Sequence, residues 1–254
     1  FYSYYPYQEE VRSQTSSDGD YYTAEYELGN TDILYAYDDA YRFKSYADQL
    51  GFNAGYIRFL KKYEDRSQYY SIYKPKLVYG HLLAALIVNA NSTADNANIR
   101  IQKVELIDVY TSATLYIADS RKSGNMSGKI EPVGNRDNIV LKGGDNGEKT
   151  DFSDIVLGTD YRELSKFIVF PGSETHPVTK FAMNVTFGIY VNGTLSGNPV
   201  TKTATVTPPR NKTVFEAGKK YNVNITVDDA LNIELIETSL NEFDEGGDTG
   251  FTWN

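Results

Sequence analysis

The chain has 254 residues, 34 acidic and 25 basic, with a formal net charge of −9 and no cysteine. This length can bury the cores of two ordinary domains without disulfides. The acidic balance and the lack of any Lys and Arg cluster exclude nucleic acid as an expected partner, because phosphate contacts need such clusters. The absence of cysteine excludes a disulfide framework and thiolate metal sites.

Targeting and membrane signals are weak. The longest apolar run, Leu82 to Val88, is too short to cross a bilayer. The opening FYSYYPYQEE has no basic and apolar leader, so we expect either a cytosolic protein or one whose leader has been removed.

Tyrosine is the anomaly in the composition, since most of the 22 tyrosines lie at or before Tyr79. Two interpretations stay open. Tyrosine favours strands and fills the cores of β-sandwiches. It also gives a rigid, amphipathic contact surface for sugar or protein at little cost in rotamer entropy.

The first half predicts strands with one helical insertion. The segment DDAYRFKSYADQLG at 38–51 spaces apolar residues at helical intervals and ends on glycine, which predicts a short helix. HLLAALIV at 81–88 fits a buried strand or a helix turn, and its flanks favour the strand. NIRIQKVELIDVY from Asn98 predicts a long strand with a bulge between Ile101 and Val104. We expect residues 114–117 to form the hairpin partner of this strand.

A Gly-, Asn- and Asp-rich stretch from residue 123 onward suggests the domain boundary, with only a short strand at 138–141. We therefore expect an N-terminal β-sandwich domain at 1–122 and a C-terminal one at 123–254. KFIVFPGS at 166–173 predicts a strand that ends at Pro171.

The second half has the clearest alternation. We expect strands at 181–191, 200–207, 221–227 and 232–240, joined as a meander. In the segment VFEAGKKYNVNITVDD, Val223, Ile225 and Val227 alternate with polar residues, so we expect them to point into the core.

Motifs for catalysis are missing. The sequence has no nucleophile elbow, phosphate loop, dinucleotide fingerprint or EF-hand loop. His81 lies in an apolar run and is expected to be a satisfied core residue, and His176 a loop residue. The acidic runs at 145–154 and 244–250 are typical of solvated turns. We expect no enzymatic activity, no catalytic or metal-binding residue and no cofactor. A glycosidase pair of carboxylates would leave no sequence motif, because its two residues need to be close only in the folded protein.

The order of several motifs resembles the fimbrillin-like proteins of Bacteroidales, the subunits of type V pili. The matching segments are TDILYAY at 31–37, VYGHLLAALIV at 78–88, IRIQKVELIDV at 99–109, FIVFP at 167–171 and FEAGKKYNVNITV at 215–227. The phenylalanine, glycine and tyrosine turn in the last segment is the most specific. The chain departs from the family at Tyr79 and Phe243, where phenylalanine and tryptophan are common, and 38–75 looks like an insertion.

The resemblance implies two β-sandwich domains of transthyretin-like topology, export as a lipoprotein, and a place at the outer membrane or in a fimbria on the cell surface. It implies assembly with other pilus subunits by donor-strand exchange, in which a strand of the next subunit fills an open groove. Such a head-to-tail contact builds a filament. In these pilins a trypsin-like protease trims the N-terminal region after an arginine, and Arg12, in the polar EEVRSQTSSDGD, is the candidate, in an accessible linker. A solvated surface arginine is the alternative.

Two function classes follow. The first is a structural pilus subunit involved in cell adhesion. The second is a surface adhesin or glycan-binding lipoprotein on the same scaffold, whose partner is a host or bacterial surface protein or glycan. The tyrosine-rich segment from Tyr35 to Tyr73 suggests an exposed contact surface, with Tyr69, Tyr70 and Tyr73 as its candidate residues. A locally packed insertion that covers a sheet edge is the alternative.

Overall fold

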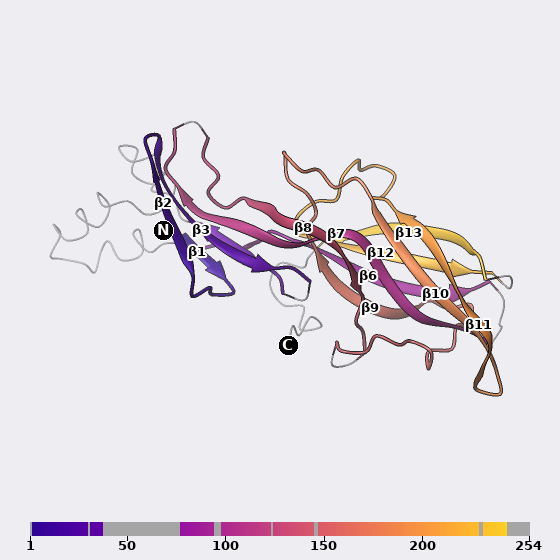
Figure 1. Ribbon diagram of the computed structural model, residues 1–254. Coiled ribbons are helices and arrows are strands. Elements are labelled where there is room, and N and C mark those ends of the chain that lie inside the picture. The colour runs from indigo at the N-terminus through magenta and orange to yellow at the C-terminus, as the bar shows by residue number, and fades with distance from the viewer. Residues whose placement is uncertain are drawn as a thin grey trace, which may run out of the picture. The chain divides into compact units, whose positions relative to one another are not determined.

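The computed structural model describes residues 2–29, 31–37, 77–93, 98–122, 124–144, 147–228 and 231–242. These residues form strands and connecting turns, which confirms the predicted all-β class (Figure 1). The helix expected at 38–51 lies outside the described residues. Throughout the described part of the chain, no helix is long and apolar enough to span a membrane.

The described strands form three sheets. In chain order the strands are β1 (Tyr2–Tyr5), β2 (Val11–Ser16), β3 (Gly19–Glu27), β4 (Leu34–Tyr37), β5 (Gly80–His81), β6 (Ala84–Ser92), β7 (Ile99–Asp119), β8 (Ile130–Val140), β9 (Arg162–Val169), β10 (Phe181–Val191), β11 (Thr194–Val206), β12 (Lys219–Val227) and β13 (Ile233–Glu242). The sheet orders are β1-β4-β5, then β11-β10-β7-β3-β2 with β8 also on β7, and β13-β12-β6-β9.

The chain divides into two compact units whose segments alternate along the sequence. Unit 1 contains residues 1–26, 32–82 and 114–131, and unit 2 contains 27–31, 83–113 and 132–254. Strand β7 therefore contributes its first part to unit 2 and its last part to unit 1. The expected division between residues 122 and 123 into independently folding domains stays a prediction.

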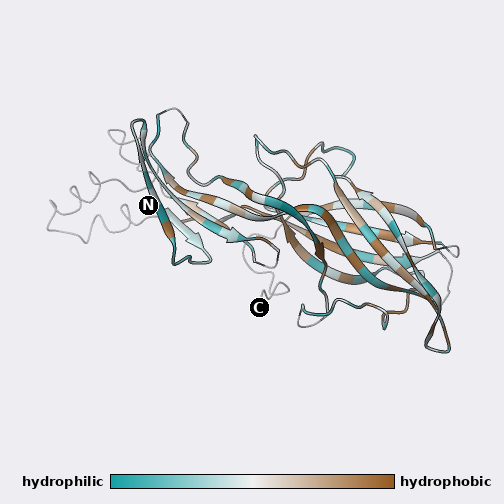
Figure 2. Cartoon of the chain, in the orientation of Figure 1, coloured by the Kyte–Doolittle hydropathy of each residue, from teal (hydrophilic) through white to brown (hydrophobic). Residues whose placement is uncertain are grey.

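Unit 2 has two layers. One contains β11, β10 and the first part of β7, and the other is the sheet β13-β12-β6-β9. Phe215 bridges the two, since its ring centroid lies 4.6 Å from that of Phe181 on β10 and 4.8 Å from that of Tyr221 on β12. Figure 2 shows apolar and polar residues alternating along these strands. Unit 2 is therefore arranged like a sandwich, with the apolar faces of its strands turned inward.

Strand β12 has the burial that its alternation predicts. Val223, Ile225 and Val227 are 0% exposed, whereas the neighbouring Asn222 and Asn224 are half-buried and Thr226 is 9% exposed. The strand is central in its sheet, because it pairs antiparallel with β13 and parallel with β6. The inward assignment of the three apolar residues is confirmed.

Most of the expected strands are present. The strand at 181–191 is confirmed as β10, the favoured strand interpretation of HLLAALIV is confirmed as β6, and the strands at 221–227 and 232–240 correspond to β12 and β13. Three strands begin earlier than expected: β8, β9 and β11, at Ile130, Arg162 and Thr194.

The bulge in β7 is confirmed, but the hairpin after it was wrong. On β10, Thr186 pairs with Lys103 and Phe187 with Ile101, so Gln102 is the extra residue. Residues 114–117 belong to the same strand as Ile99, which runs on to Asp119. Asp108 adopts a left-handed conformation with φ of 56°. Aspartate tolerates this conformation, and the strand continues through it.

The expected meander of four strands was also wrong. Strands β10 and β11 form one hairpin and β12 and β13 another, in different sheets. After Val206 the chain passes from one layer to the other through Phe215, and both sides of β12 are occupied by β6 and β13. Neighbours in sequence therefore do not pair here, because β12 takes its second partner from β6, far earlier in the chain.

Candidate assembly site

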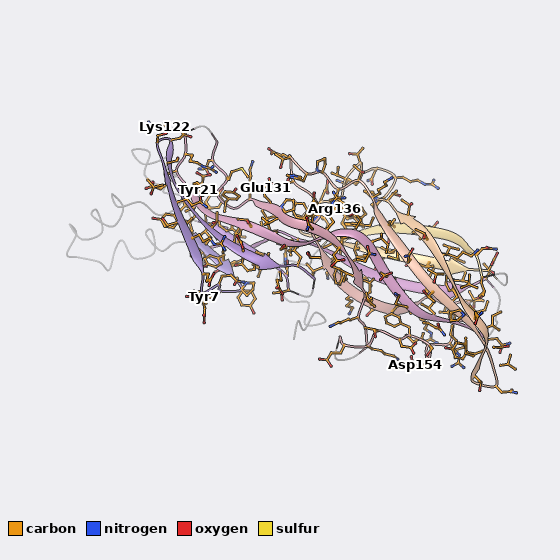
Figure 3. All side chains as sticks on the ribbon, viewed as in Figure 1. Tyr7, Tyr21, Lys122, Glu131, Arg136 and Asp154 are labelled. Atoms are coloured by element: carbon orange, nitrogen blue, oxygen red, sulfur yellow. The ribbon has the colours of Figure 1, made fainter. Side chains whose placement is uncertain are left out.

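Strand β1 is an edge strand of the small sheet in unit 1. Among the described strands it pairs with β4 alone, in the register Tyr2 with Tyr37 through Tyr5 with Leu34. The next strand, β2, belongs to a different sheet, where it pairs with β3. Between the two lies a link, residues 6–10, whose Tyr7 is 74% exposed (Figure 3). One short antiparallel ladder thus joins β1 to the rest of its sheet.

Arg12 lies in strand β2, so the expectation of a linker there was wrong. Its partner in the ladder is Thr23, and its guanidinium is 2.5 Å from the carboxylate of Glu25 on β3. The side chains of Arg12 and Glu25 are 58% and 48% exposed, and ion pairs at such exposure contribute little stability. All of β2 is exposed, which explains why the sequence lacks the apolar period that would have predicted a strand.

Tyr69, Tyr70 and Tyr73 lie outside the described residues, so the contact surface assigned to them stays a prediction. The described part of unit 1 has exposed aromatic side chains of its own. They are Tyr5, Tyr7, Tyr22, Tyr37 and Tyr79.

Beside β1 lies Tyr35 of strand β4, opposite Tyr4, and its side chain is buried. Its hydroxyl donates a hydrogen bond of 2.9 Å to the carbonyl oxygen of Ile117 on β7. Its ring packs against Gly128, where a Cβ would lie 2.4 Å from the ring. Burial raises the pKa of Tyr35 well above its usual value, and the neighbouring Tyr2 adds to this. The ring is therefore fixed at one end by a hydrogen bond and at its side by a glycine.

Asp119 organises the loop that follows β7. Its carboxylate forms hydrogen bonds with the guanidinium of Arg121, the shortest 2.6 Å, and accepts one from the backbone N–H of Met126. Burial alone would raise the pKa of Asp119, but the hydrogen bonds from Arg121 and Met126 outweigh it and the pKa is lowered. The Arg121 guanidinium also lies 4.2 Å from the ring centroid of Tyr21. This network was not predicted, since only RKSGNMSG marks it in the sequence.

Two motifs of the family resemblance meet in unit 1. The carboxylate of Asp32, in TDILYAY, shares a hydrogen bond with Nδ1 of His81, in VYGH. His81 also pairs with Leu34 across β4 and β5. Asp32 is 7% exposed and His81 is half-buried, so the histidine is satisfied by the protein, as expected. The pair attaches the two-residue strand β5 to β4.

The phenylalanine, glycine and tyrosine turn at 215–221 also holds segments together by hydrogen bonds, in unit 2. The buried Tyr221 hydroxyl accepts a 2.8 Å hydrogen bond from the backbone N–H of Glu216. Gly218 has a φ of 69° and donates its N–H to the carbonyl of Leu83. Glycine takes this conformation without a steric penalty, so the turn directs the chain into β12.

Metal-binding arrangements are missing from the described segments: no three His, Cys, Asp or Glu side chains gather there as ligands. His176 lies in an exposed loop, as expected, and its Nδ1 is 2.9 Å from the hydroxyl of Thr175.

Comparison with known proteins places the chain in a family. Among solved structures, a candidate cell adhesion protein from Bacteroides uniformis is 18% identical with a TM-score of 0.46, and the match covers 96% of this chain and 71% of that one. A fimbrial protein from Bacteroides vulgatus is 12% identical with a TM-score of 0.46, with 95% and 76% covered. No curated protein matches the chain. The family model described as fimbrillin-like matches residues 1–242, so the chain belongs to the fimbrillin-like family.

Proposed function

We propose that the chain is a structural subunit of a bacterial surface pilus of the type V kind, which assembles with other pilus subunits by strand exchange and takes part in cell adhesion. Membership of the fimbrillin-like family supports a pilus or adhesion subunit in a cell-surface appendage. The observation that carries the assembly mechanism is the position of β1 at the edge of its sheet, with one partner among the described strands, followed closely by Arg12.

Removal of β1 would open a defined acceptor edge. Strand β4 lies between β1 and β5, so the loss of β1 leaves the β4 backbone at Leu34–Tyr37 without partners on that side. It also uncovers the buried ring of Tyr35. An open edge with an apolar floor is filled by adding a strand. A strand donated by the next subunit joins unlike surfaces, and such contacts extend into a filament.

Cleavage after Arg12 would cut the chain between β1 and the rest of unit 1. Proteases bind extended, locally unpaired substrate, so β2 must first separate from β3. This opening costs little, because all six residues of β2 are exposed and bury almost no apolar surface. The exposed pair of Arg12 and Glu25 adds little resistance.

The remaining parts of the proposal follow the family. We propose export as a lipoprotein precursor, location at the outer membrane or in the fimbria, and two sandwich domains of transthyretin-like topology. The role is structural, without catalysis or a cofactor, which membership of a family named for fimbrial subunits supports.

Limited digestion with trypsin tests the proposal. We expect the first cut after Arg12, release of the N-terminal segment with β1, and then oligomers in size-exclusion chromatography and filaments in electron microscopy. Lys122, exposed in the loop after β7, is one competing site (Figure 3). An Arg12→Gln variant is the matched control and should stay monomeric under the same digestion. Trimmed protein that loses β1 and remains monomeric would refute assembly by strand exchange.

A surface adhesin or glycan-binding protein on the same scaffold is the second candidate. The exposed tyrosines of unit 1 favour it, because exposed aromatic rings with hydroxyl groups suit sugar and protein recognition. Replacing Tyr69, Tyr70 and Tyr73 by serine, and separately Tyr5 and Tyr7, tests it. Loss of binding to glycan arrays or to cells, at an unchanged melting temperature, supports the adhesin. A large fall in melting temperature identifies the rings as core and removes this candidate.

A further inference from the structure

Tyr26 joins the end of β1 to a strand of another sheet. Its hydroxyl donates a 2.7 Å hydrogen bond to the carbonyl oxygen of Pro6, the residue directly after β1. Tyr26 lies on β3, which pairs with β2, whereas β1 pairs with β4. Tyr26 is 4% exposed, so the donor lies within the folded unit and not at its surface. The end of β1 is therefore attached to a buried side chain outside its own sheet.

The hydrogen bond from Tyr26 differs from two other side-chain contacts of the N-terminal segment. Ser3 shares a hydrogen bond with Tyr79, and Arg12 pairs with Glu25, and both of these contacts are exposed to solvent. Exposed polar contacts add little stability, because water competes for the same groups. Burial raises the pKa of Tyr26 well above its usual value. The hydroxyl therefore keeps its proton at neutral pH and remains a donor.

The ladder between β1 and β4 does not favour one strand over another. Its hydrogen bonds join backbone groups over the four residues Tyr2–Tyr5. An incoming strand makes the same kind of backbone bonds, so the ladder that is lost when β1 leaves is regained when its replacement docks. The bond from Tyr26 lies beyond this ladder, at Pro6. It adds to the hold on β1, and an incoming strand gains it only with a carbonyl at the same point.

We propose that Tyr26 is a latch that holds β1 in place after the chain is cut at Arg12, so that cleavage and strand release are separate steps. The inference rests on the proposed strand exchange and adds a point of control to it. Cleavage leaves the bond from Tyr26 to Pro6 intact, because neither residue adjoins the cut. A cut subunit then keeps the edge of β4 covered until a partner strand competes for it. This matters because an uncovered strand edge pairs readily with other chains.

A release assay on a cut chain tests the latch. A site for a specific protease is inserted between Glu9 and Glu10 in the full chain, and a dye is attached to the N-terminus. After the cut, β1 and Pro6 are held by noncovalent contacts alone. An excess of unlabelled peptide with the sequence of residues 2–6 prevents rebinding, and fluorescence anisotropy follows loss of the labelled segment. We expect Tyr26→Phe to speed release about tenfold, because the carbonyl of Pro6 loses its buried donor.

Two further variants are matched controls. Tyr22→Phe removes a hydroxyl from the same strand as Tyr26, but Tyr22 is 44% exposed. Ser3→Ala removes the exposed hydrogen bond to Tyr79. Each should change the release rate less than about threefold, as is usual for surface substitutions. Circular dichroism and the melting temperature of each uncut variant check that it is folded.

Peptides of two lengths locate the bond. Amidated peptides with the sequences of residues 2–5 and 2–6 differ by Pro6, which supplies the carbonyl. In the cut wild-type chain we expect the longer peptide to replace β1 with about tenfold higher affinity than the shorter one. In Tyr26→Phe most of this advantage should disappear, because the two changes remove the same interaction.

The outcomes separate the latch from strand exchange. Faster release in Tyr26→Phe alone, together with a smaller advantage of the longer peptide, supports the latch. Equal release rates for the wild type and Tyr26→Phe, or an equal advantage of the longer peptide in both, would refute the latch while strand exchange stands. If excess peptide never displaces β1 from either cut chain, the proposed strand exchange fails as well.

Discussion

Replacement of Ile225 gives the sharpest test of the core of unit 2. Ile225 is 0% exposed on the central strand β12, opposite Ala90 of β6 and Ile236 of β13. Ile225→Ala removes three carbon atoms, at about 0.8 kcal/mol for each buried methylene, or about 2.4 kcal/mol in transfer free energy. The cavity adds to this, so we expect the free energy of unfolding to fall by about 3–4 kcal/mol.

Ile225→Asp should cost more, about 5 kcal/mol, because it removes the same contacts and also buries a carboxyl group without a partner. For a chain of this size, 1 kcal/mol corresponds to about 2–4 °C in melting temperature. Ile225→Ala should therefore lower the melting temperature by about 6–16 °C, and the aspartate variant by more.

Thermal and urea unfolding followed by circular dichroism measures both variants. Glu237→Ala is the matched control, since Glu237 is exposed on β13 and pairs with Asn224, the residue next to Ile225. It should change the free energy of unfolding by less than about 0.5 kcal/mol. An Ile225→Asp variant with the wild-type melting temperature would refute the inward orientation and the two-layer core built on it.

Four further outcomes are expected. Gly128→Ala should lower the free energy of unfolding by about 1–3 kcal/mol, because the new Cβ would lie 2.4 Å from the Tyr35 ring and the φ of Gly128 is +75°. Gly124→Ala is the control, since Gly124 has open space around it. Equal melting temperatures for the two variants would contradict the contact between Gly128 and Tyr35. Tyr221→Phe should cost about 1–3 kcal/mol in urea unfolding, because the N–H of Glu216 loses its acceptor. The pKa of Asp119 is lowered in the folded protein, so the stabilisation from its carboxylate is present above the unfolded pKa of about 3.9 and is lost as the pH falls through the folded pKa. Asp119→Asn should therefore flatten the fall in unfolding free energy at acid pH. An unchanged pH dependence would argue against the pairing with Arg121. His81→Ala should speed hydrogen exchange at the β4 amides after cleavage at Arg12, and unchanged exchange would show that Asp32 and His81 do not hold β5.

The sequence predicted strands well where apolar and polar residues alternate clearly. It predicted poorly which strands pair with one another. Phe181 to Phe187 and Tyr221 to Ile225 alternate between buried and half-buried residues, because one face of each strand lies in the two-layer core. Which strands pair with one another does not follow from such a local pattern. Strand β12 pairs parallel with β6, and nothing in either segment specifies a neighbour so distant in the chain. Short-range patterning encodes which face is buried, and tertiary packing decides what lies beside it.

At the candidate assembly site, too, the sequence pointed to individual residues but not to the contacts between them. Arg12 was found by its charge and polar setting, but its strand was not, because β2 buries neither face and carries no period. Asp32 and His81 were each noted within separate motifs, 49 residues apart, and their contact was not predicted. The hydrogen bond from the N–H of Asp119 to the Ser127 hydroxyl had no signal at all, since a serine in a polar loop looks like any other.

The contact between Asp32 and His81 has its greatest consequence when β1 is absent. Strand β4 has four residues, and among the described residues it pairs, on the side away from β1, with just the two residues of β5. So short a ladder contributes few hydrogen bonds, and a strand held in this way would separate readily. The bond between Asp32 and His81 adds a side-chain attachment on the β5 side, and the hydroxyl of Tyr35 adds another to Ile117 on β7. Neither involves β1. The proposed strand exchange needs such attachments, because a β4 strand that left together with β1 would leave no edge for a partner strand to join. The family motifs in unit 1 therefore lie where they hold the edge of β4 without the help of β1.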